Sequence, residues 1–161
     1  MDRERFHFLF QQEKGEIDRA QWAKYAAYLA GLVVVLTLPW LWARHHIVHD
    51  LAVDPLFAPK IFLAYFYALL YGFALILIGA SYMNLTAKRF RALGWPSPLG
   101  FASLVPLVAF FTGALRLAPI LSSFLVPYAP TWAIWGAEAA FMGVAGWTAW
   151  ELGVKRREGD E

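Results

Sequence analysis

The chain alternates long apolar runs with short charged clusters, and this pattern predicts four membrane-spanning helices. The apolar runs occupy about residues 22–43, 61–87, 97–118 and 131–152. The longest of them has 27 residues without a charged side chain, whereas about 20 apolar residues suffice to cross a bilayer. We therefore expect an all-α integral membrane protein that forms one membrane domain over residues 1–161.

The polar segment before the first span predicts a short helix and a helix start. The amphipathic pattern of Arg3–Gln12 favours an interfacial helix over a flexible tail. Its apolar residues would lie at the headgroup boundary: Phe6, Leu9 and Phe10. Asp18 followed three residues later by Gln21 is typical of a capping box. We therefore expect the first long helix to begin directly after Asp18.

Lysine and arginine are distributed unevenly between the two ends of the predicted spans. Threading the chain as four spans puts eleven of the 14 cations on one side and three on the other. The eleven are Arg3, Arg5, Lys14, Arg19, Lys24, Lys88, Arg89, Arg91, Lys155, Arg156 and Arg157. Because excess Lys and Arg remain in the cytoplasm, we expect both termini to be cytoplasmic.

Composition agrees with a small multi-pass membrane protein. Hydrophobic residues make up 60% of the chain and charged residues 16%, whereas soluble domains carry about 25% charge. The 8 Trp and 7 Tyr residues suit the headgroup region of a bilayer. Because the chain has no cysteine, disulfides, thiolate metal sites and cysteine nucleophiles are excluded.

Two stretches carry a family resemblance. Residues 15–22 read Gly-Glu-Ile-Asp-Arg-Ala-Gln-Trp, and residues 88–96 read Lys-Arg-Phe-Arg-Ala-Leu-Gly-Trp-Pro. In order and spacing they resemble the bacterial membrane family called domain of unknown function 805, over about residues 15–118. Ala92 stands where that family has an acidic residue. The resemblance implies an integral protein of the bacterial inner membrane, for a family with no established general activity.

The last apolar run carries a stripe of small residues. Gly136, Ala140 and Gly143 fall within about 60° of one another around a helix, and small residues let helix backbones approach closely. Glu138 lies about 160° from Gly136 on the same helix. We therefore expect the stripe to pack inside the bundle and Glu138 to face a second protein.

Glu138 is also the charged residue that lies deepest within a predicted span. It follows Thr131 by seven residues, which places it about 10 Å inside the helix. Arg116, near the same end of the preceding span, is the cation placed to pair with it. Two interpretations stay open: a proton or ligand site that includes partner binding, and a protonated or paired structural carboxyl group.

Two further clusters are candidate binding sites. His45, His46, His49 and Asp50 include pairs at the i, i+4 spacing of one helical face, and imidazole binds transition metals. No second cluster completes the ligand set, so a solvated interfacial turn is favoured over a metal site. Lys88, Arg89 and Arg91, with Trp95, form a basic turn that suits anionic lipid headgroups. We expect membrane lipids as partners there, no cofactor, and no nucleic acid.

The sequence contains no phosphate-binding loop, zinc-protease helix or nucleophile elbow. The favoured function is therefore a non-catalytic accessory subunit that packs through its fourth helix against a larger membrane complex, of respiratory or photosynthetic type. One alternative is a small transporter or channel that uses Glu138 and Arg116. A second alternative is a lipid- or quinone-modifying membrane enzyme, based on Glu138 and the histidine cluster.

Overall fold

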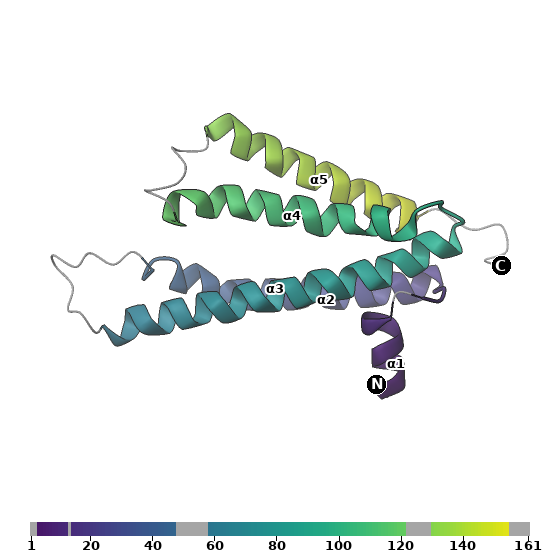
Figure 1. Cartoon of the computed structure of the whole chain (residues 1–161), viewed down its shortest axis with the longest axis horizontal. Helices are drawn as coiled ribbons and strands as arrows, with labels where there is room; N and C mark the ends of the chain where they lie inside the picture. Colours follow the sequence, from purple (N-terminus) through teal and green to yellow (C-terminus); the bar gives the residue numbers. More distant parts are fainter. Residues whose placement is uncertain (1–2, 13, 48–57, 122–129, 155–161) are drawn as a thin grey trace. The chain divides into compact units, whose positions relative to one another are not determined.

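The structure is a computed structural model that describes residues 3–12, 14–47, 58–121 and 130–154, with backbone alone for 117–121. Every regular element in this part of the chain is helical, so the all-α prediction is confirmed (Figure 1). The elements are α1 (Arg3–Phe6), the π-helical turn η1 (His7–Gln11), α2 (Arg19–Ala43), α3 (Pro59–Ala92), α4 (Pro98–Leu121) and α5 (Thr131–Gly153). The four long helices begin and end within a few residues of the predicted spans.

Three of the helices are long and apolar enough to cross a membrane: Arg19–Ala43, Pro59–Ala92 and Pro98–Arg116. Helix α3 has 34 residues and therefore extends about 51 Å, more than the roughly 30 Å of a hydrocarbon core. Helix α5 has 23 residues, which is also long enough. Its composition is less apolar, because it contains two glutamates and four tryptophans.

Contacts divide the chain into two units, residues 1–26 with 80–161 and residues 27–79. The division crosses α2 and α3, so each of these helices contributes to both units. The first unit contains the basic turn, α4 and α5.

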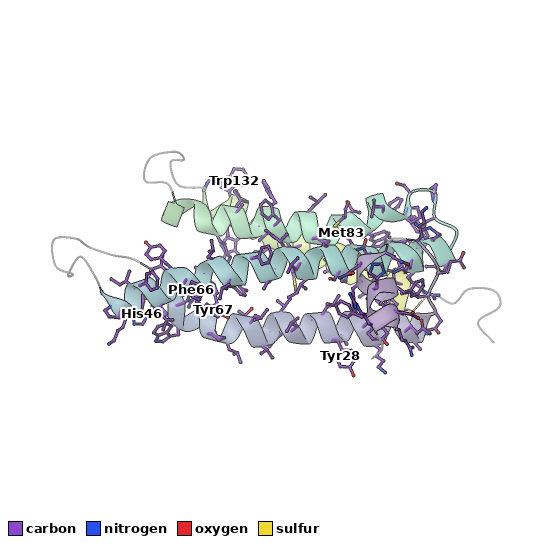
Figure 2. All side chains as sticks on the ribbon, turned by 60° about the horizontal axis from the view of Figure 1, so that its bottom comes forward. Tyr28, His46, Phe66, Tyr67, Met83 and Trp132 are labelled. Carbon is purple, nitrogen blue, oxygen red and sulfur yellow. The ribbon has the colours of Figure 1, made fainter. Side chains whose placement is uncertain are left out.

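In the unit of residues 27–79, aromatic side chains of α3 contact α2 around a proline. Pro39 has no N–H, so α2 loses one helical hydrogen bond there. Nearby, the Tyr67 hydroxyl donates to the carbonyl of Leu36 at 2.5 Å, and Figure 2 labels Tyr67 on α3. Tyr71 stacks on Trp40 with ring centroids 5.3 Å apart. Polar contacts from a neighbouring helix are how proline is tolerated in membrane helices.

In the other unit, α4 and α5 lie side by side and antiparallel (Figure 1). The Thr112 hydroxyl lies 2.8 Å from the carbonyl of Val108 in its own helix and 3.2 Å from that of Ala137 on α5. Ala137 and Thr148 are buried on the face that α5 turns inward. Small side chains at these positions permit the close approach of the two backbones.

The predicted N-terminal helix is present as α1 and η1, but its apolar face does not meet the headgroup boundary as expected. Leu9 and Phe10 are only 1% and 8% exposed, and the ring of Phe10 packs edge-on against Tyr25 at 5.8 Å. Phe6 alone of the three stays exposed. The amphipathic pattern identified the apolar face correctly, but such a pattern does not distinguish lipid from protein as its neighbour.

The predicted N-cap of α2 is confirmed. The backbone N–H of Gln21 donates to the Asp18 carboxylate at 2.6 Å, which satisfies one of the donors left open at a helix start. Ile17 and Trp22, on either side of this cap, are both buried.

The end of α3 is closed by a glycine cap. Gly94 adopts a φ of 76°, a conformation that side chains other than glycine rarely take. The N–H of Trp95 donates to the carbonyl of Phe90 at 3.1 Å, and that of Gly94 to Arg91 at 2.9 Å. These two bonds form a Schellman motif, and the Phe90 and Trp95 rings pack edge-on at 5.5 Å, the hydrophobic contact that accompanies it.

Candidate functional site

Four polar side chains at the end of α3 bind backbone carbonyls, and we call them the basic cluster: Asn84, Lys88, Arg89 and Arg91. Burial is the unusual property of this cluster. Lys88 is 0% and Arg89 1% exposed, and the residues from Leu85 to Phe90 are all buried. Buried lysine and arginine need polar partners, because removing a charge from water is costly.

Lys88 is held by the N-terminal segment. Its ammonium donates to the backbone carbonyls of Phe8 and Leu9, the latter at 3.1 Å. It also lies 4.5 Å from the centre of the Phe8 ring, which adds a cation–π attraction. The partners of this buried ammonium are therefore backbone dipoles and an aromatic face.

The other members of the cluster bind backbone carbonyls as well. The Asn84 amide donates to Phe10 at 2.8 Å, and Arg91 donates to Gly15 at 3.0 Å. The guanidinium Nε of Arg89 lies 3.4 Å from the carbonyl of Leu152 at the end of α5. The cluster thus joins the N-terminal segment, the end of α3 and the end of α5.

Helix termini explain why carbonyls serve as the partners. The last four carbonyls of a helix have no intrahelical donor, and this end carries a partial negative charge. Phe8 and Leu9 lie in the last turn before η1 ends at Gln11, and Leu152 precedes the last residue of α5. Cations from α3 satisfy these open carbonyls, so α3 caps two helix ends at once.

The expectation that the basic turn contacts lipid headgroups is corrected for Lys88 and Arg89, because protein encloses both side chains. Arg91 is half-buried. Trp95 is half-buried in an aromatic cluster with Phe101 at 4.7 Å and Trp147 at 5.9 Å. For Lys88 and Arg89 the sequence did not indicate protein partners, since a cation suits helix carbonyls as well as phosphates.

Arg116 and Glu138 form the predicted pair. Nε of Arg116 lies 2.7 Å from Oε1 of Glu138, and Nη2 donates to the same oxygen. The two side chains are 62% and 30% exposed. Glu138 is therefore bonded within its own chain, which removes the original reason to place a second protein against it.

The small-residue stripe lies on the opposite side from the one expected. Gly136, Ala140 and Gly143 are exposed, and a Cβ added at either glycine would meet nothing within 4 Å. Helix α5 turns Ala137 and Glu138 toward α4 instead. The sequence gives the angle between stripe and carboxylate but not which of them faces the neighbouring helix.

The histidine cluster is described only in part. His46 stacks on Trp42 at 4.5 Å, and its Nδ1 lies 3.0 Å from the Trp42 carbonyl. His45 is exposed at the end of α2. His49 and Asp50 lie outside the described residues, and within the described part no group of three potential metal ligands gathers.

Sequence reasoning missed the acceptors of the basic cluster and the role of Asn84. One signal was present: Asn84 precedes Lys88 by four residues, so both project from the same face of a helix. The carbonyls of Phe8, Leu9 and Leu152 carry no sequence signal, because every residue has one. Glu151, which is 8% exposed beside Leu152, was likewise not singled out.

The described helices define the class of this protein. It is a helical membrane protein with three helices that are long and apolar enough to cross a bilayer. No family model, curated protein or solved structure matches this chain.

Proposed function

We propose that the chain is a non-catalytic accessory subunit that packs through α5 against other integral subunits of a larger membrane complex. The observation that carries this proposal is the exposed stripe of Gly136, Ala140 and Gly143, on a side of α5 that α4 does not cover. Another membrane helix can approach such a stripe closely, because association in lipid depends on backbone proximity and packing.

The proposal includes a topology. Helix α5 is a fourth span, both termini lie in the cytoplasm, and the membrane is the inner membrane of a bacterium. Support comes from the asymmetric distribution of cations and from the basic cluster, which joins the N-terminal segment to the ends of α3 and α5. The resemblance to domain of unknown function 805 is part of the same proposal.

Matched leucine substitutions test the interface on α5. Ala140→Leu enlarges a residue of the stripe, whereas Ala149→Leu enlarges an exposed residue about 180° around the same helix. We expect Ala140→Leu to lower the fraction of the chain that co-purifies with partner subunits in mild detergent about tenfold, since about 1.4 kcal/mol of lost packing has that effect. Ala149→Leu should leave the fraction unchanged.

Mass spectrometry of the assembly extracted from the native membrane is the readout. A defined complex containing this chain, weakened by Ala140→Leu alone, supports the subunit role. A monodisperse lone protein, or equal effects of the two leucine variants, would contradict it.

One alternative has a specific observation in its favour. Arg116 on α4 pairs with Glu138 on α5. Paired charges of this kind also line transport pathways in membrane proteins. Under this alternative, Glu138→Gln changes ion or solute flux in liposomes. The subunit role predicts instead that the purified wild-type chain carries no ion or solute flux.

A further inference from the structure

We propose that Arg116 and Glu138 together bind the headgroup of a phospholipid with a primary ammonium group, of the phosphatidylethanolamine type. The site lies where α4 ends and α5 begins. This inference rests on the proposed placement of α5 across the membrane, but it is independent of any partner subunit.

The pair leaves one hydrogen-bonding atom of each residue open. Both bonds from Arg116 end on Oε1 of Glu138. Among the described residues, neither Nη1 of Arg116 nor Oε2 of Glu138 takes part in a hydrogen bond. Because the two side chains remain 62% and 30% exposed, a ligand can reach a donor and an acceptor that lie side by side.

Arg116 and Glu138 lie at a depth that matches the boundary between the lipid headgroups and the hydrocarbon. Arg116 lies 18 residues after Pro98 and Glu138 seven after Thr131, or about 27 Å and about 10 Å along their helices. Trp132 and Trp135 on α5 are 76% and 69% exposed, and Figure 2 labels Trp132 near the start of this helix. Exposed tryptophans mark the membrane interface, and Trp135 precedes Glu138 by only about 4.5 Å of helix.

Charge complementarity selects the ligand. A guanidinium donates well to phosphate oxygens, and an arginine side chain this close to the interface extends toward the headgroups. The second carboxylate oxygen of Glu138 accepts from a primary ammonium. Phosphatidylcholine offers no N–H donor, and phosphatidylglycerol offers neutral hydroxyl donors but no cation, so an ammonium-bearing phospholipid is the best match to both residues.

Native mass spectrometry of the purified full-length chain tests the site in micelles with equal amounts of the ethanolamine, choline and glycerol phospholipids. The wild-type chain should retain the ethanolamine lipid about tenfold more than the choline lipid, the ratio produced by about one charge-assisted hydrogen bond. Glu138→Gln should bring this ratio close to one. Arg116→Gln should lower retention of all three lipids, and the exposed cation Arg44 supplies the matched control, Arg44→Gln.

Three outcomes would overturn the proposal. One is a wild-type ratio near one, and another is a ratio that Glu138→Gln leaves unchanged while circular dichroism shows intact helices. The third is loss of bound lipid on adding inorganic phosphate alone, which would indicate a phosphate site without headgroup selection. Because the purified chain is tested without any partner, its selectivity for the lipid decides this site alone, and the assembly extracted from the native membrane decides the subunit role.

Discussion

Lys88→Met is expected to release the N-terminal segment from the end of α3. The methionine keeps the apolar stem but removes the ammonium that donates to the carbonyls of Phe8 and Leu9. Leaving two buried carbonyls without a donor costs about 2–6 kcal/mol, at about 1–3 for each unsatisfied group. Hydrogen exchange of the amides in residues 3–11 should therefore accelerate, and the thermal midpoint in detergent should fall.

Lys60→Met is the matched control, because Lys60 is exposed at the other end of the same helix. It should change neither the exchange of residues 3–11 nor the midpoint. Wild-type exchange of these amides in Lys88→Met would show that the ammonium does not hold the segment.

Phe90→Ala is expected to be strongly destabilising. Phe90 is 0% exposed. The centroid of its ring lies 5.5 Å from that of Trp95, 5.8 Å from that of Phe101 and 6.0 Å from that of Trp147. Truncation of a fully buried phenylalanine costs about 3–5 kcal/mol, as lost burial plus the cavity that remains. The measurement is the free energy of unfolding in mixed micelles.

Phe110→Ala makes the same change on α4 at a ring that is 71% exposed, so little of its contact is with the chain itself. We expect it to cost far less than Phe90→Ala. Equal losses in the two variants would mean that the aromatic cluster around Phe90 is not a stabilising core.

Helix positions followed from the sequence because the signals are local. Unbroken apolar runs predicted four long helices, and Asp18 with Gln21 predicted where α2 begins. The glycine cap at the end of α3 depends on Gly94 in the same local way. Each of these features acts within a few residues, so one sequence suffices to locate it.

The binding partners of the charged residues were harder to predict from the sequence. Lys88 binds Phe8 from 80 positions away, and its acceptor is a backbone carbonyl that any sequence could supply. The charge of Lys88 predicted that its ammonium lies outside the hydrocarbon. It did not predict whether the ammonium binds lipid phosphates or protein carbonyls. Arg116 and Glu138 were paired correctly, because opposite charges near one end of two neighbouring spans leave few other arrangements.

The sequence did not predict which side of α5 faces α4. Periodicity fixes the angles among Gly136, Glu138 and Ala140, but the rotation of the helix about its axis depends on the whole surface of α4. The hydroxyl of Thr112, near the carbonyl of Ala137, belongs to that surface. The ion pair of Glu138 with Arg116 is made on the same face, so α5 turns its carboxylate and not the stripe toward α4.

We propose that the basic cluster gathers the N-terminal segment, the turn after α3 and the end of α5 on one side of the membrane. Because the chain has no cysteine, single cysteines at exposed positions report sidedness directly with a membrane-impermeant maleimide. We predict that Lys14→Cys, Ser97→Cys and Val154→Cys are labelled only in inverted vesicles, and Arg44→Cys only in right-side-out vesicles. Labelling of Lys14→Cys and Val154→Cys from opposite sides would contradict this topology.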